Sequence, residues 1–164
     1  MRRSLSILAA GTLALGASLG GAAPASADTV VFPAGLACAD FDLGIDIEGG
    51  ARVEREFTDR DGNVVRTLSA GTGAALTFTN LDTDVTFATT SNGAATHTTF
   101  NGDGSSTLSL TGHNILVLFP TDVPPGPTTG LYVGRVTLTV DSGGVYTVLQ
   151  TSGWITDICA QLSA

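Results

Sequence analysis

After the first 27 residues, apolar and polar side chains alternate along most of the chain, and this period of two is the feature that most restricts the fold. Residues 51–57, 76–79 and 132–140 show it clearly, with Thr and Val at many positions. Such alternation turns one face of a strand to a core and the other to water, and β-branched residues suit this pleated surface. No later stretch has a sustained helical period. The pattern predicts an all-β protein.

Turn signals separate the alternating segments. They are Asp61-Gly62, Asn92-Gly93, Asn101-Gly102-Asp103-Gly104 and Asp141-Ser142-Gly143-Gly144. Spacings of roughly 10 to 20 residues favour antiparallel hairpins and leave little room for crossover helices. Residues 120–130 contain four prolines and are predicted to form a surface loop. The predicted strands lie near 42–48, 51–58, 63–69, 74–80, 84–90, 94–100, 105–112, 114–119, 130–141, 144–151 and 154–159.

So many strands must either pack as two layers or close into a barrel. We expect a single-domain antiparallel β-sandwich over residues 28–164, with an up-and-down β-barrel as the alternative. One hairpin can be predicted in register, because a three-residue loop at 60–62 with Gly62 in the left-handed region pairs Asp59 with Asn63. The partners before and after the loop are then Phe57 with Val65 and Glu56 with Arg66.

Residues 1–27 have the layout of a secretory signal peptide. Arg2 and Arg3 form a basic start, an apolar stretch follows, and small residues precede the boundary between Ala27 and Asp28. Signal peptidase accepts small residues at positions −1 and −3, so we expect cleavage after Ala27. Glycines interrupt the apolar stretch and no basic cluster follows it, which disfavours a retained membrane anchor. We therefore expect a secreted, extracellular protein, exported by the general or the twin-arginine route.

Cys38 and Cys159 lie near the two ends of residues 28–164, and the chain has no other cysteine. In an oxidising exterior they are expected to form a disulfide. Closing a loop of about 120 residues stabilises the fold by about 4–5 kcal/mol in the chain-entropy model. The bond also needs Cα atoms about 5.5 Å apart, so the two ends must meet. Two free thiols are the alternative.

The charge of the chain disfavours two classes of partner. Lys+Arg total 7 and Asp+Glu 15, a net charge of −8, and without Arg2 and Arg3 the balance is 5 against 15, or −10. Five arginines without a lysine cannot neutralise a run of phosphates, so we expect no nucleic-acid partner. Repulsion from anionic headgroups argues against electrostatic docking to a membrane.

Two motifs resemble parts of known sites but are better explained as hairpin turns. Residues 141–144, DSGG, resemble the segment around the nucleophile of trypsin-like serine proteases, but the chain is too short for two barrels, and His97 and His113 lack that family's histidine motif. Residues 59–63, DRDGN, resemble the start of a calcium loop, yet Gly is fourth rather than sixth and the twelfth position is Ala70. We predict no catalytic residue, metal ligand or cofactor.

A two-residue turn at Gly102-Asp103 would determine what the flanking strands present. It would pair His97 with Leu108 and place His113 about 17 Å along the strand, too far for a shared zinc ion. The same register would gather hydroxyl groups on one strand face, which could bind a polymer or simply face water. These residues are Thr96, Thr98, Thr107, Ser109 and Thr111.

Two other groups are candidates for binding. Three carboxylates would share one face of a strand and could form a loose acidic site, although a solvated face is the simpler interpretation. They are Asp40, Asp42 and Asp46. Sugars stack on exposed aromatic rings, but Trp154 lies beside Ile155 and near Ile158, so we expect it in the core.

Several segments resemble a group of small secreted all-β proteins from actinobacteria. The matching segments are FPAGLACADFDL, GNVVRTLSAGTG, LTFTN, TGHNILVLFPTDVPPGP, LYVGRVTLTVD and a late DIC. The resemblance covers nearly all of residues 28–164 and implies an exported origin. It implies no activity and assigns no role to any residue.

Three functions remain open. We favour a non-catalytic extracellular binding module, whose partner is an extracellular polymer or a small apolar ligand. A barrel holding an apolar ligand would need a large cavity lined by Leu, Val and Phe. A hydrolase or isomerase using carboxylates would need an Asp or Glu in a cleft with a strongly raised pKa.

Overall fold

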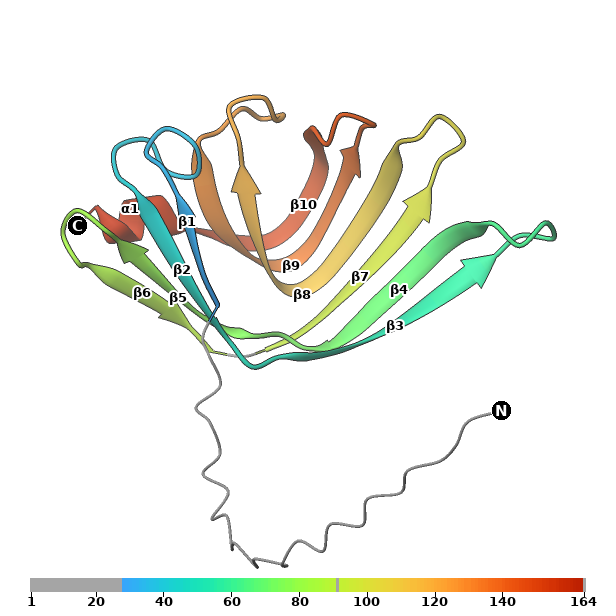
Figure 1. Ribbon diagram of the computed structural model, residues 1–164, viewed down its shortest axis with the longest axis horizontal. Coiled ribbons are helices and arrows are strands. Elements are labelled where there is room, and N and C mark those ends of the chain that lie inside the picture. The colour runs from blue at the N-terminus through green and yellow to red at the C-terminus, as the bar shows by residue number, and fades with distance from the viewer. Residues whose placement is uncertain (1–27, 91, 164) are drawn as a thin grey trace, which may run out of the picture.

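The computed structural model describes residues 28–90 and 92–163, so the expected signal peptide, residues 1–27, lies outside the described residues. In this range the chain forms ten strands and one short helix (Figure 1). They are β1 (Asp28–Phe32), β2 (Leu43–Glu48), β3 (Ala51–Thr58), β4 (Val64–Thr72), β5 (Ala75–Asn80), β6 (Thr86–Thr89), β7 (Gly93–Phe100), β8 (Ser106–Leu118), β9 (Thr128–Val140), β10 (Tyr146–Asp157) and α1 (Ile158–Leu162). The predicted all-β class is confirmed.

The strands form two antiparallel sheets. One has the order β1-β2-β5-β6, and the other has the order β10-β9-β8-β7-β4-β3. Within the described range neither sheet closes on itself, so the alternative prediction of a barrel is wrong and the arrangement agrees with a sandwich. Each sheet keeps two edge strands, β1 and β6 in one and β10 and β3 in the other.

One long hairpin belongs to both sheets. β2 continues into β3 through residues 49–50, two glycines with positive φ of 67° and 88°, and β4 continues into β5 through residues 73–74. Pairing keeps its register through this break: Glu48 pairs with Ala75, and Ala51 with Thr72. The hairpin therefore bends from one sheet into the other without losing its partner.

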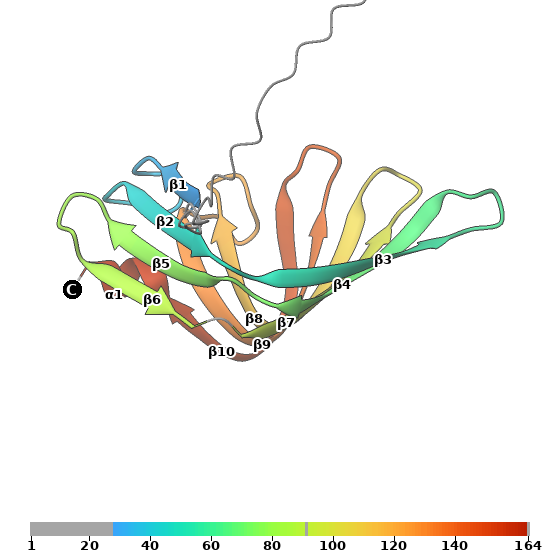
Figure 2. The same ribbon diagram turned by 60° about the horizontal axis from the view of Figure 1, so that its bottom comes forward.

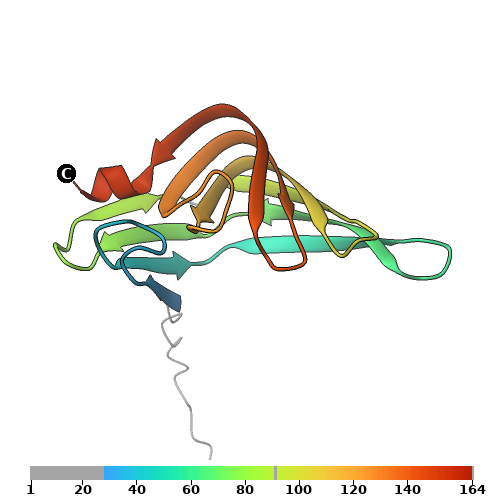
Figure 3. The same cartoon turned by 90° about the horizontal axis from the view of Figure 1, so that it is seen from above.

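The six-stranded sheet bends at a row of small residues that we call the crease. Paired from β4 to β10, these residues are Gly71, Ala94, Gly112, Gly134 and Gly153. At Gly134 φ is 137°, and a Cβ would lie 2.1 Å from the carbonyl oxygen of Ser152. Only a residue without a side chain tolerates such an approach, and glycines placed in register are a known means of curving a sheet. Figure 3 shows the resulting arch of β9 and β10, in orange and red.

The main core lies between the four-stranded sheet and two paired segments, residues 113–118 of β8 and 128–133 of β9. Leu43, Phe78 and Ile158 are fully buried there, and Ile115 and Leu131 pack against them. The predicted disulfide joins Cys38 and Cys159, with 5.6 Å between the Cα atoms and 121 residues of sequence separation. The bond connects the segment before β2 to α1.

A second apolar cluster fills part of the concave side of the crease. Leu110 precedes the crease, Leu116 follows it, and both pack with Val136 and Leu138. The loop predicted at 120–130 spans residues 119–127, because residues 128–130 already belong to β9, and this proline-rich loop returns to the start of β10. There the Val123 amide donates to the Tyr146 carbonyl at 2.8 Å. This loop therefore ties the two arms of the bent sheet together.

Several predicted boundaries are wrong. The predicted strands 105–112 and 114–119 are the single strand β8, and the predicted strands 144–151 and 154–159 are one strand, β10, that ends at Asp157. Gly112 and Gly153 bend these strands rather than ending them. Residues 158–162 are helical because the Asp157 carboxylate accepts the Ala160 amide as an N-cap. Strand β1 was not predicted.

The predicted hairpin has the expected loop but a different register before it. The Asp59 amide donates to the Asn63 carbonyl at 2.9 Å, and φ of Gly62 is 87°. A bulge between Phe57 and Thr58 then shifts the pairing, so Phe57 faces Arg66 rather than Val65, and Glu56 faces Thr67 rather than Arg66. The Arg66 guanidinium lies 5.6 Å from the centre of the Phe57 ring, a cation–π contact that replaces the predicted apolar pair.

Candidate ligand pocket

Both motifs that resembled known sites form hairpin loops. In residues 141–145 the Asp141 carboxylate accepts the Gly143 and Val145 amides at 2.8 and 3.0 Å. In residues 59–63 the Asp59 carboxylate accepts the Asp61 and Asn63 amides and the Asn63 side chain. The Asn63 side chain lowers the pKa of Asp59, and its amide lowers it further. Local hydrogen bonds of the turn therefore use both carboxylates.

The predicted face of hydroxyl groups on β7 and β8 is wrong, because the loop between these strands has three residues rather than two. Residues 102–104 form a three-residue loop with φ of 84° at Gly104, so His97 pairs with Ser109 rather than Leu108. A slip of one residue exchanges the faces of a strand. Thr96 and Thr98 therefore share a face with the leucines of β8, whereas the hydroxyls of Thr107, Ser109 and Thr111 belong to the opposite face.

The predicted acidic strand face is not formed either. Asp40 and Asp42 precede β2, and only Asp46 lies on it. The Asp42 carboxylate accepts the Ala34 amide at 2.8 Å, and Asp46 accepts the Thr29 hydroxyl. Among residues 28–90 and 92–163, no group of three or more His, Cys, Asp or Glu side chains could hold a metal ion.

Trp154 lies at the surface, contrary to the prediction. Its side chain is 69% exposed, whereas Ile158 is fully buried. The reason is topological: β10 is an edge strand, and the chain enters the core only after it turns into α1. The ring borders a shallow pocket of about 350 Å³ together with Val133 and Phe87.

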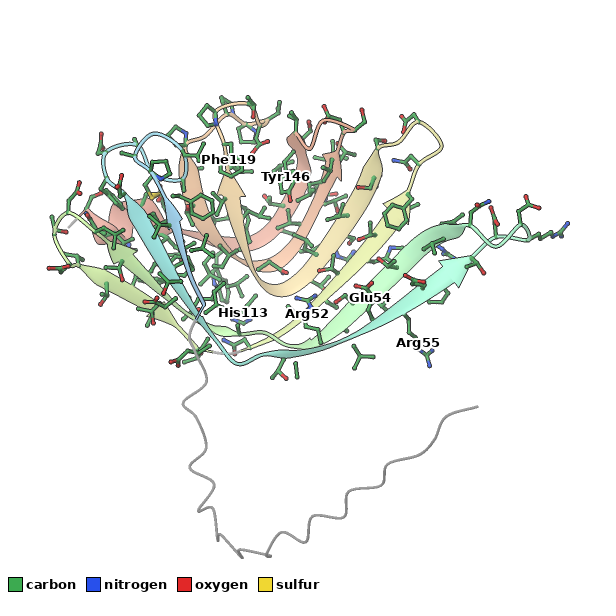
Figure 4. The ribbon with its side chains drawn as sticks, in the orientation of Figure 1. Arg52, Glu54, Arg55, His113, Phe119 and Tyr146 are labelled. Carbon is green, nitrogen blue, oxygen red and sulfur yellow. A yellow bond between two sulfur atoms is a disulfide. The ribbon has the colours of Figure 1, made fainter. Side chains whose placement is uncertain are left out.

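A larger pocket of about 620 Å³ lies on the concave side of the crease, and we call it the concave pocket. Its walls are mainly apolar and come from β5, β7, β8, β9 and the turn between β4 and β5: Ala74, Leu76, Ala94, Leu108, Leu110, Ile115, Leu116, Val117 and Leu138. Its polar lining consists of Arg52, Thr96, His113, Asn114, Asp122 and Tyr146. Figure 4 places Arg52 and His113 near the crease, and Phe119 and Tyr146 at the other end.

Arg52 reaches the pocket from β3 because it stands beside the crease, paired with Gly71. The guanidinium extends across β4 to β7. Its Nε donates to the Ser69 hydroxyl at 3.0 Å, and its Nη2 donates to the Ser69 carbonyl at 3.3 Å and the Thr96 hydroxyl at 3.2 Å. In the described part of the chain no carboxylate forms an ion pair with Arg52.

Asn114 follows the crease on β8 and contributes a donor to the pocket. Its Nδ2 atom is buried and meets no acceptor among the described residues. Buried polar groups in folded proteins usually have a hydrogen-bond partner, so this donor needs an explanation. Its partner across the strand is Tyr132, whose pKa is raised by burial and further by the Asp157 carboxylate. The phenol therefore stays neutral at ordinary pH.

Asp122 and Tyr146 close the end of the pocket that lies away from the crease. One Asp122 carboxylate oxygen accepts the Phe119 amide at 2.7 Å, and the other accepts the Tyr146 amide at 2.8 Å. Asp122 is only 4% exposed, and these two backbone amides satisfy both oxygens of its buried carboxylate. Asp122 holds the proline-rich loop against β10, and its carboxylate oxygens are used by these backbone amides rather than by Arg52.

Sequence reasoning identified Thr96 and His113 as residues of interest but missed Arg52, Asn114, Asp122 and Tyr146. The usable signal was the set of single glycines inside alternating segments, because such glycines mark bends or close approaches of the backbone. Bends at Gly112 and Gly134 would have predicted a concave face. Which side chains line it depends on strand pairings far apart in sequence.

No protein family model, curated protein or solved structure matches this chain. No helix in residues 28–90 and 92–163 is long and apolar enough to cross a membrane. The disulfide is compatible with an extracellular location.

Proposed function

We propose that the protein is a secreted, non-catalytic binding protein that holds a small ligand in the concave pocket. The expected signal peptide, the disulfide and the resemblance to exported actinobacterial proteins support secretion. The observation that carries the binding role is the pocket of about 620 Å³, whose apolar walls surround a few polar groups. This combination of size and lining is typical of small-molecule sites.

Two observations favour binding over catalysis by carboxylates. The lining contains a single carboxylate, Asp122, and backbone amides occupy both of its oxygens. General acid–base work by two carboxylates needs a second such group on the other side of the substrate. The carboxyls whose pKa is shifted, Asp59 and Asp103, have lowered values and lie in hairpin loops.

The test uses two matched variants of the secreted protein. Thr96 and Thr99 both lie half-buried on β7 but on opposite faces, and only Thr96 lines the pocket. Purified protein is analysed by native mass spectrometry and solvent extraction for bound small molecules, and is then screened for binders by thermal shift. We expect a ligand that Thr96→Trp abolishes and Thr99→Trp retains. Failure to find any binder, or equal loss in both variants, would refute the proposal.

The exposure of Trp154 supports a second candidate function. A ring 69% exposed on an edge strand offers a flat face on which a sugar of an extracellular polymer could stack. Sedimentation with insoluble chitin or cellulose tests this directly. Under this alternative, Trp154→Ala abolishes co-sedimentation while Thr96→Trp leaves it unchanged.

A further inference from the structure

The polar groups of the concave pocket are distributed unevenly along it. Arg52 and Thr96 stand near the crease, as Figure 4 shows for Arg52, and the leucines of β8 and β9 form the walls. Phe119 and Tyr146 add aromatic surface at the far end, and the Asp122 carboxylate there is already hydrogen-bonded to the Phe119 and Tyr146 amides. A ligand that matches this lining has one polar end and one apolar body.

The polar groups available near the crease are hydrogen-bond donors. The Nδ2 of Asn114 is buried with no acceptor, and Nη1 of Arg52 has no partner among the residues that the structure describes. Ser69 and Thr96 hold the other side of the guanidinium, so its position is fixed before a ligand arrives. A guanidinium held in this way is suited to accept a carboxylate.

The nearest acidic side chains of this face do not compete for that position. Glu54 is the next residue of β3 that shares the face of Arg52, but it does not line the pocket. Asp122 lines the pocket, but the Phe119 and Tyr146 amides occupy its carboxylate. The positive charge of Arg52 is therefore available to a ligand.

We propose that the concave pocket binds a carboxylate-headed amphiphile, with its carboxylate at Arg52 and its apolar chain along the leucine walls. This inference rests on the proposed binding function and specifies its ligand class. A guanidinium recognises an anionic head more strongly than a neutral one, because hydrogen bonds between two charged groups are stronger than those to a neutral group. A cationic head at Arg52 is repelled.

The experiment compares three probes with the same ten-carbon chain and different heads: decanoate, decan-1-ol and decyltrimethylammonium. Binding to the secreted protein is measured by calorimetry at low ionic strength, below the concentration at which the probes form micelles. We expect decanoate to bind at least tenfold more tightly than decanol, and the cation most weakly. Added salt should weaken decanoate binding and leave decanol binding nearly unchanged.

Two arginines of one strand provide a matched pair of variants. Arg52 and Arg55 both lie on β3, but Arg55 belongs to the opposite face and points away from the concave side in Figure 4. Arg52→Gln should weaken decanoate at least tenfold with little effect on decanol, whereas Arg55→Gln should change neither.

The outcomes separate this inference from the proposed function. If decanol binds as tightly as decanoate and Arg52→Gln has no effect, the head-group assignment is wrong but the pocket still binds apolar ligands. If no decyl compound binds, the amphiphile assignment is overturned, and the wider screen with Thr96→Trp alone decides whether the pocket binds anything. Equal losses in Arg52→Gln and Arg55→Gln would indicate a long-range charge effect and also overturn the assignment.

Discussion

Two regions of the bent fold are stabilised by different interactions. We call β1, β2, β5, β6, α1 and the paired segments 113–118, 128–133 and 154–157 of β8, β9 and β10 the sandwich half, and β3, β4 and β7 the wing. Leu43 and Phe78 in the sandwich half are fully buried, whereas Val53 and Leu68 in the wing are 72% and 37% exposed. Figure 2 shows the β3–β4 hairpin extending beyond the other strands as a single layer.

The difference in burial shows that the two regions are stabilised by different interactions. The sandwich half gains most of its stability from apolar burial and the disulfide, whereas the wing depends on backbone hydrogen bonds, cross-strand pairs and loop contacts. Yet the wing supplies Arg52 and Thr96 to the pocket. The part that contributes least to the core thus positions two of the polar residues that line the pocket.

The largest effect should follow from loss of the disulfide. The bond closes a separation of 121 residues, so replacing both cysteines by alanine should lower the free energy of unfolding by about 4–5 kcal/mol in the chain-entropy model. Urea unfolding with and without reductant measures the difference. Thiol labelling of the unreduced wild-type protein is the control and should be negative. An unchanged free energy of unfolding after reduction would contradict a stabilising role of the disulfide.

The same substitution in the two regions tests the comparison most directly. Leu43→Ala removes a fully buried side chain and should cost about 2–5 kcal/mol. Leu68→Ala, at a position 37% exposed in the wing, should cost less than about 1 kcal/mol. Both values come from urea unfolding of the variants. Similar losses at the two positions would mean that the wing is covered in solution.

A substitution at the crease should have an intermediate effect. Gly134→Ala places a Cβ 2.1 Å from a backbone oxygen at a φ of 137°, and should destabilise the protein by about 2–3 kcal/mol. Gly102→Ala, whose Cβ would meet nothing within 4 Å, is the matched control and should be nearly neutral. Equal thermal unfolding curves for the two variants would show that the crease relaxes easily.

The smallest expected effect concerns the loop at the tip of the wing. The Asn63 side chain and amide hold the pKa of Asp59 below its ordinary value of 3.8. The stabilisation by ionised Asp59 is therefore present above that value and lost as the pH falls through the lower, folded-state pKa. Carboxyl resonances followed by NMR should show a midpoint below 3.8, and Asn63→Ala should raise it. An unchanged midpoint in the variant would contradict this cause.

The sequence predicts local structure better than the relation between distant strands. Alternation and turn residues were enough for the all-β class, and cysteine positions for the disulfide. The loop at 60–62 was also predicted correctly, because Asp59 and Gly62 determine it locally. The bulge at Phe57 was not, since a cation–π contact with Arg66 replaced the expected apolar pair.

The pocket could not be predicted because its lining depends on the register of several strand pairs. A register error of one residue in one pair changes which side chains reach the pocket. One residue of loop length at 102–104 decides whether Thr96 shares a face with Leu110 or with Ser109. Trp154 was assigned to the core from its apolar neighbours, but the edge position of β10 puts it in solvent. Neighbours in sequence do not show on which side of a bent sheet a residue lies.

The disulfide also determines how tension would travel through the molecule. Because it joins residues 38 and 159, a pull on both termini would be carried across the covalent bond. Only the short stretches outside the bond, including β1, would bear load before the sulfur–sulfur link does. A protein tethered to a surface and dragged by flowing fluid could then keep its pocket undistorted.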